Sequence, residues 1–281
     1  MNFRFFVFCL FALSITTPAY AQDFPKYGDE LYQPRLRQAG KDVMWMPTPD
    51  AMVMRMLQAA KVTDKDLVYD LGAGDGKIPI AAAKHFGAKA VGIEYNADLA
   101  ALGRRNAQRA GVADKVTIIE GDIFQQDFSK ATVVTLYLLP DLNYRLRSTL
   151  LWMKPGTRVV SYQWHMGEWE PDEVIRGEET EAYLWIVPAI VQGHWTLRDE
   201  KGAWEAAIEF TQQHQRLAGE ITINGVTKPL LGAYVSGTNI GFTFVAPDGG
   251  THSMRGGSDG KTISGTLRFV DNLTPVFGRR R

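Results

Sequence analysis

The stretch that decides the fold reads Val68-Tyr69-Asp70-Leu71-Gly72-Ala73-Gly74-Asp75-Gly76. A short apolar run ends in an acid, three glycines follow at alternate positions, and an amphipathic helical pattern begins at Ile78. Glycines let backbone N–H groups approach a ligand closely, and the start of a helix offers unpaired N–H donors. The stretch therefore predicts a strand, a helix, and between them a ligand-binding turn made of Gly72, Ala73, Gly74 and Gly76.

The same alternation of apolar runs and helical patterns continues to about residue 161. Short continuous apolar runs separated by amphipathic helices are typical of a parallel sheet buried on both faces. The predicted strands are 67–71, 90–93, 116–119, 132–138 and 158–161. The predicted helices are one that starts at Pro49-Asp50 and those at 78–86, 97–110 and 142–152. We expect an open α/β domain over residues 46–194, with an arm at residues 22–45 lying across it.

Residues 195–281 follow a different pattern, in which apolar and polar residues alternate about every two positions. Asn224-Gly225 and Asp259-Gly260 stand between such runs, and these pairs favour the positive φ angles of hairpin turns. The pattern predicts a small antiparallel β domain that forms a barrel or a sandwich. The terminal Arg279, Arg280 and Arg281 are expected to form a solvated tail.

Composition excludes several classes of protein. The chain has 281 residues, 45% hydrophobic and 22% charged, which excludes disorder as its main state. Its 31 basic residues balance its 31 acidic ones, so no overall field attracts a polyanion, and a nucleic-acid partner is not expected. The five histidines are scattered without metal-ligand spacing, so no metal site is predicted.

Residues 1–21 have the pattern of a secretory signal peptide. Arg4 precedes an apolar run from Phe5 to Ile15, and Ala19-Tyr20-Ala21 forms a small-x-small cleavage site. The run is shorter than the roughly 20 residues of a membrane-spanning helix, so no stable transmembrane span is expected. The predicted location is periplasmic or secreted, with an uncleaved membrane anchor as the minor alternative. The one cysteine, Cys9, lies in this segment, so the mature chain has no thiol.

Two further acids follow the next two predicted strands. Glu94 stands 22 residues after Gly72, where an acid can bind both hydroxyls of a ribose. Asp122 follows the third strand and could meet an adenine amino group. Asp70 beside the ligand disfavours a pyrophosphate and favours a cationic amine or sulfonium. These acids therefore predict a nucleoside ligand with a cationic group.

These residues resemble the first motif of class I S-adenosylmethionine-dependent methyltransferases, an acid followed by three alternating glycines, and the resemblance covers residues 40–190. A closer resemblance is to the lysine methyltransferases of the mitochondrial ATP synthase c-subunit type and their bacterial relatives. Met46-Pro47-Thr48-Pro49, residues 68–83 and residues 92–96 carry it. The resemblance implies a Rossmann-like sheet, S-adenosylmethionine as cofactor, and contacts to its methionine moiety from Thr48 and the glycine turn. It also implies ribose binding by Glu94.

The fourth predicted strand ends in Tyr137-Leu138-Leu139-Pro140-Asp141. This departs from the Asn-Pro-Pro-Tyr or Asp-Pro-Pro-Tyr of methylases that act on planar amides and bases, which argues against such acceptors. A lysine acceptor has to lose a proton, so an acid or a tyrosine is expected near it, and Tyr137 and Asp141 are the catalytic candidates. An equally open interpretation has Tyr137 in the core and Asp141 as a helix N-cap.

The predicted function is transfer of a methyl group from S-adenosylmethionine to an amine, either a protein lysine or a small molecule. The leader conflicts with this function, because the cofactor is made in the cytosol. The alternative is an exported, non-catalytic binding protein whose α/β pocket or β domain holds a small ligand or an envelope partner. A dinucleotide oxidoreductase is a third interpretation, disfavoured by the glycine spacing.

Overall fold

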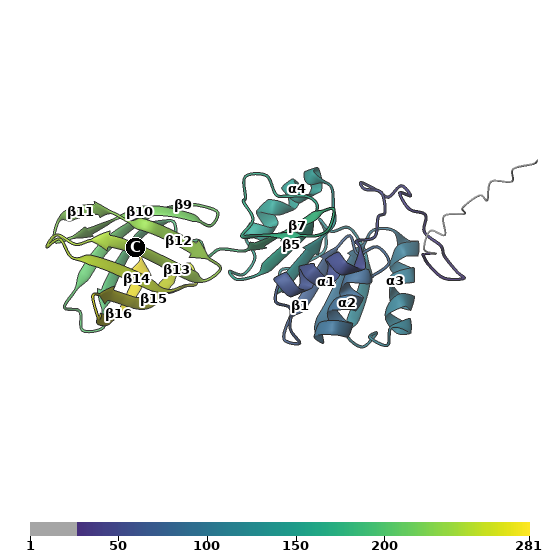
Figure 1. Ribbon diagram of the computed structural model, residues 1–281, viewed down its shortest axis with the longest axis horizontal. Coiled ribbons are helices and arrows are strands. Elements are labelled where there is room, and N and C mark those ends of the chain that lie inside the picture. Colours follow the sequence, from purple (N-terminus) through teal and green to yellow (C-terminus); the bar gives the residue numbers. More distant parts are fainter. Residues whose placement is uncertain (1–26) are drawn as a thin grey trace, which may run out of the picture.

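The computed structural model describes residues 27–281, which form an α/β lobe and a β lobe joined by residues 187–192 (Figure 1). The predicted signal peptide and the first residues of the predicted arm lie outside the described residues. Between residues 27 and 281, no helix is both long enough and apolar enough to cross a membrane.

The α/β lobe contains a seven-stranded sheet with the order β3-β2-β1-β4-β5-β7-β6. The five strands from β3 to β5 are parallel, and β7 runs antiparallel to both of its neighbours. The bounds are β1 Leu67–Leu71, β2 Lys89–Glu94, β3 Val116–Glu120, β4 Val133–Leu136, β5 Arg158–Tyr162, β6 Glu173–Arg176 and β7 Glu181–Ile186. The predicted Rossmann-like sheet is confirmed, and the β6–β7 hairpin is an addition that was not predicted from the sequence.

Four helices complete this lobe: α1 Asp50–Ala59, α2 Lys77–Phe86, α3 Ala97–Arg109 and α4 Pro140–Leu151. Their apolar faces contribute to two buried clusters, one that includes α1, α2 and α3 and one that includes α4. The Asn96 side chain caps α3, because its Oδ1 accepts hydrogen bonds from the N–H groups of Asp98 and Leu99. In α4 the N-cap is Leu139, so the interpretation of Asp141 as an N-cap is wrong.

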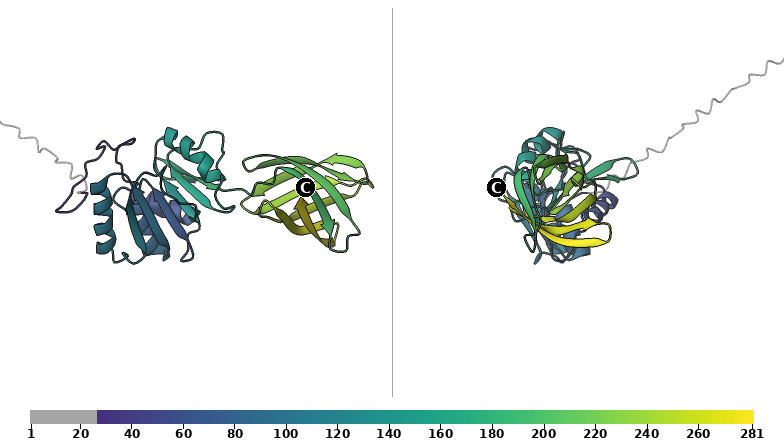
Figure 2. Two further views of the ribbon diagram at one scale, coloured as in Figure 1. Left: turned by 180° about the vertical axis from the view of Figure 1, so that it is seen from behind. Right: turned by 90° about the vertical axis from the view of Figure 1, so that its left-hand side faces the viewer.

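The β lobe is a closed antiparallel barrel of eight strands, seen from two further directions in Figure 2. Closure comes from the pairing of β9 with β10, which joins the two ends of the strand series. The bounds are β8 Gly193–Asp199, β9 Glu205–Gln213, β10 Arg216–Ile223, β12 Leu231–Ser236, β13 Asn239–Val245, β14 Thr251–Ser258, β15 Thr262–Phe269 and β16 Asn272–Arg280, with the short β11 Val226–Pro229 beside β10. Its interior is filled by buried apolar side chains, including Trp195, Phe210 and Phe244. The predicted antiparallel β domain is thus confirmed as a barrel.

The three terminal arginines are exposed, as expected, but the prediction that they form a tail is wrong. Arg279 and Arg280 belong to β16, which pairs with both β15 and β8. The Arg280 guanidinium lies over the Trp195 ring, 5.2 Å from its centroid, and donates to the carbonyl of Ile190. The chain end therefore forms part of the barrel wall, because closing the barrel supplies partners on both sides of this strand.

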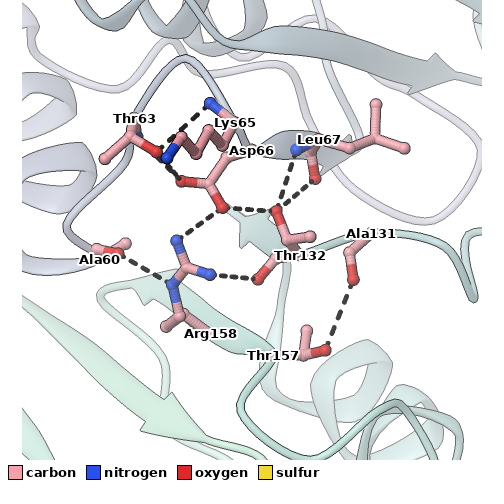
Figure 3. A network of polar contacts seen from close by, with 9 residues as sticks. All are labelled: Ala60, Thr63, Lys65, Asp66, Leu67, Ala131, Thr132, Thr157 and Arg158. Atoms are coloured by element: carbon pink, nitrogen blue, oxygen red, sulfur yellow. Dashed lines mark hydrogen bonds and ion pairs between the residues drawn. The ribbon is translucent and has the colours of Figure 1, made fainter.

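A polar network ties the amino ends of β1, β4 and β5 together (Figure 3). Arg158 donates from Nη2 to Asp66 Oδ1 at 2.8 Å and from Nε to the carbonyl of Ala60 at 3.0 Å. Thr132 Oγ1 donates to the same Asp66 oxygen at 2.7 Å. Burial raises the pKa of Asp66, but the hydrogen bonds from Thr132, from the Thr63 N–H and from Arg158 outweigh it, so the pKa lies below its usual value.

We expect Arg158→Met to lower the free energy of unfolding by about 3 kcal/mol, because it leaves a buried carboxylate without its cation. The lowered pKa of Asp66 means that this stabilisation is present above the unfolded pKa and disappears as the pH falls. Urea unfolding at pH 7 and at pH 3 measures both effects. The control is Arg198→Met, which breaks the exposed pair with Glu205 and should cost less than about 1 kcal/mol. Equal costs for the two variants would contradict the prediction.

Candidate active site

The glycine turn after β1 forms the floor of the site. Gly72, Gly74 and Gly76 have φ angles of 87°, 55° and 82°, a region that side-chain-bearing residues rarely occupy. A Cβ on Gly74 would lie 2.7 Å from the Trp45 ring, and one on Gly72 would lie 2.9 Å from Leu138. Two requirements thus coincide here, since the backbone needs glycine and the space above it is limited.

Glu94, at the end of β2, holds this turn in place. Its Oε2 accepts the Gly74 N–H at 2.7 Å, and its Oε1 accepts the Asn96 N–H at 2.8 Å. Each carboxylate oxygen has a further lone pair, so both can still accept hydrogen bonds from ligand hydroxyls. Burial raises the pKa of Glu94, while the backbone N–H groups lower it in part.

Asp70 lies at the end of β1 and is 3% exposed. Thr135 Oγ1 donates to its Oδ1 at 2.7 Å. Burial, together with the nearby charges of Glu94 and Asp75, raises the pKa of Asp70 to about 7. Burial also raises the pKa of Asp75. Three carboxyl groups in a low-dielectric site favour a cationic ligand, which would stabilise their ionised forms.

Asp122 lies after β3 and forms an ion pair with Lys41 of the arm, Nζ to Oδ2 at 2.8 Å. The same Lys41 ammonium lies 4.6 Å from the centroid of the Tyr95 ring. The hydrogen bond from Lys41 is the main cause that lowers the pKa of Asp122. The third predicted acid is therefore present at the site, with a lysine partner that was not predicted from the sequence.

The arm also covers the glycine turn. Trp45 is 8% exposed and packs edge-on against Tyr27, with ring centroids 5.3 Å apart. Asp29 anchors the arm to α3 through ion pairs with Arg105 at 2.5 Å and Arg109 at 3.1 Å. Residues 38–48 line the site as a result, and they include the predicted Thr48.

The glycine turn, the acids and residues 38–48 border one cavity of about 250 Å³. Among the predicted site residues, the structure brings eight to it: Thr48, Asp70, Gly72, Ala73, Gly74, Glu94, Asp122 and Tyr137. Gly76 lies at the N-cap of α2, behind the lining, where a Cβ would be 3.3 Å from Gly103 of α3. Asp141 is exposed in the first turn of α4 and does not line the cavity.

Several lining residues were not predicted from the sequence, among them Lys41, Trp45, Tyr95 and Gln163. Gln163 directly follows β5, so its position after an apolar strand was an available signal. The arm residues carried no such signal, because no regular pattern connects them to a strand of the sheet.

Comparison with known proteins shows which family the sequence belongs to. Residues 70–173 match the family model described as ANTKMT methyltransferase domain. A protein-lysine N-methyltransferase of Saccharolobus islandicus is 44% identical over 151 residues, which are 52% of this chain and 94% of that protein. The chain belongs to this methyltransferase family. The prediction of a class I S-adenosylmethionine-dependent methyltransferase is confirmed.

Two further relatives extend the comparison. The Mus musculus lysine N-methyltransferase that is named for the c-subunit of ATP synthase is 36% identical over 37% of this chain and 42% of its own length. The solved RNA methyltransferase of Salinibacter ruber, in complex with S-adenosylhomocysteine, is 50% identical with a TM-score of 0.50, and the match covers 50% of this chain and 94% of that one. The predicted cofactor is thus confirmed, and the non-catalytic binding protein has no support.

Proposed function

We propose that this methyltransferase transfers a methyl group to the side-chain amine of a protein lysine. The observation that carries the proposal is the cavity, in which glycine backbone, Glu94 and Asp122 face one region and Tyr137 with an apolar wall borders another. The names of the Saccharolobus and mouse relatives support a lysine acceptor. The name of the Salinibacter relative indicates RNA, and the balanced charge of this chain argues against that acceptor.

The residues of the cavity fit the cofactor. Gly72 and Gly74 border it with backbone alone, and Glu94 and Asp122 offer carboxylate oxygens to the ribose hydroxyls and the adenine amino group. S-adenosylmethionine supplies a methyl group on a sulfonium, and the sulfur keeps the electron pair of the S–C bond when the amine lone pair takes the methyl. The protein aligns the amine and excludes water, which accounts for much of the acceleration in such displacements. Trp45 and Leu138 line the site beside Gly74 and Gly72.

Calorimetric titration with S-adenosylmethionine tests cofactor binding. We expect Gly74→Arg to abolish the heat of binding, because its side chain would start within 2.7 Å of Trp45 in a strained backbone. The matched control is Gly111→Arg, which shares a positive φ of 70° but has nothing within 4 Å of its Cβ. Retained binding in Gly74→Arg, or an equal loss of binding in both variants, would contradict the proposed cofactor site at the glycine turn. Mass spectrometry of lysine-rich proteins after incubation with enzyme and cofactor then tests the acceptor.

We also propose that the chain is exported. The signal-peptide pattern of residues 1–21 is the support for this proposal. A reporter enzyme fused after Ala21 should be cleaved near this residue and active outside the cytosol. Replacing Phe5–Ile15 by polar residues should retain it inside. A fusion that stays uncleaved and membrane-bound would favour the anchor, and a cytosolic fusion would contradict export.

A further inference from the structure

The sheet order divides the cavity into two regions. Glu94 ends β2 and Asp122 follows β3, on one side of β1, whereas Tyr137 and Gln163 follow β4 and β5, on the other side. A nucleoside bound by the two acids leaves the β4–β5 side free. This second region is therefore the place for the methyl acceptor, and its polar groups determine how the acceptor is held.

The β4–β5 region is almost entirely apolar and aromatic. Leu138, Leu139, Leu142 and the ring of Trp164 line it, and no acidic or basic side chain from β4, α4 or β5 contributes to its lining within the described chain. Its side-chain oxygens are those of Tyr137 and Gln163, and the Tyr137 hydroxyl donates to Gln163 Oε1 at 3.1 Å. Burial, with a contribution from Tyr162, raises the pKa of Tyr137, so its hydroxyl keeps its proton.

Gln163 is held in an unusual backbone conformation. Its φ angle is 65°, and among the non-glycine residues with positive φ in residues 27–281 it is the one that lines the cavity. Its N–H donates to the carbonyl of Glu181 in β7 at 2.9 Å, so the sheet pairing fixes this conformation. Such strained residues persist where the surrounding structure enforces them, often at binding sites.

We infer that Gln163, together with Tyr137, receives the acceptor amine, a role that rests on the proposed amine acceptor. Gln163 Oε1 accepts an N–H of the amine and turns the nitrogen lone pair toward the methyl group. A neutral carbonyl suits this task, because a carboxylate at the same position would stabilise the ammonium form, which has no free lone pair. The apolar walls also favour the neutral amine, because burial destabilises its charged form. Gln163 is thereby a specificity-determining residue for uncharged amines.

The test compares two ligands that need no identified acceptor. S-adenosylhomocysteine has no group at the methyl position, whereas sinefungin, a close analogue of S-adenosylmethionine, carries an amine there. We expect Gln163→Leu to weaken sinefungin at least about 10-fold without changing S-adenosylhomocysteine, since a hydrogen bond to a charged group is lost. We expect Gln163→Glu to tighten sinefungin about 10-fold through charge pairing, again without changing S-adenosylhomocysteine. Isothermal titration calorimetry gives both dissociation constants.

The matched control is Gln108→Leu, on the exposed surface of α3, which should change neither ligand. Melting temperatures verify that the variants fold. Parallel changes for both ligands would show a purely structural role for Gln163 and overturn the inference, as would no change for either. If the unaltered protein binds neither ligand, the proposed function fails instead, so the two failures are distinguishable.

Discussion

Replacing Glu94 by alanine is expected to weaken S-adenosylhomocysteine binding at least about 100-fold. The side chain accepts two backbone N–H groups, from Gly74 at 2.7 Å and from Asn96 at 2.8 Å, and under the proposed function its remaining lone pairs accept the ribose hydroxyls. Hydrogen bonds to charged groups contribute about 1.5–3 kcal/mol each, so losing two of them to the ligand exceeds a factor of 100. Glu94→Gln keeps the shape and one acceptor oxygen, and should lose about 10-fold.

Glu120 provides the matched control. It pairs with Glu94 in the register of β2 and β3, but it is exposed and does not line the cavity. Calorimetry should find the affinity of Glu120→Ala within twofold of the unaltered protein. An affinity of Glu94→Ala within tenfold of the unaltered protein would show that the carboxylate does not hold the nucleoside.

Asp70→Asn is expected to stabilise the free protein and to weaken its cofactor binding at alkaline pH. The folded pKa of about 7 lies well above the ordinary value of 3.8, so the folded state binds its proton more tightly than the unfolded state. Stability is therefore lost as the pH rises from about 4 through 7. Asparagine can still accept the hydrogen bond from Thr135 and carries no buried charge. The melting temperature should rise at pH 8 and change little at pH 4.

The same carboxyl group predicts a pH dependence of binding. The cationic groups of S-adenosylmethionine favour ionised Asp70, so affinity should increase about tenfold from pH 6 to pH 8. Glu94 and Asp75 face the same region, and burial raises the pKa of each as well. Asp70→Asn should remove most of the increase, and methylthioadenosine, which has no cationic group, should show little of it. An undiminished increase in Asp70→Asn would assign the effect to another group.

Local sequence patterns were sufficient to predict the sheet, and also the glycine turn and the acids that border the cavity. Asp70, Glu94 and Asp122 stand at or just after the carboxyl ends of three parallel strands, and such ends meet at one edge of the sheet. Positive φ angles at Gly72 and Gly74 agree with the residue type. These features depend on strand and turn preferences within a few residues, which is why a short stretch of sequence predicts them.

Other features depend on contacts between distant segments. β16 contains Pro275 and Gly278 and shows weak alternation, yet closure of the barrel pairs it on both sides. Asp141 follows β4 as the other acids follow their strands, but the first turn of α4 directs it to the surface.

By itself, then, the sequence determined the α/β domain, the glycine turn and the acids around it, because hydrophobic period and turn chemistry are local. Contacts between distant segments place Lys41 beside Asp122, Trp45 over the glycine turn and Gln163 beside Tyr137. Ion pairs, ring packing and the β5–β7 pairing set these positions, and such contacts join residues whose separation along the chain carries no periodic signal.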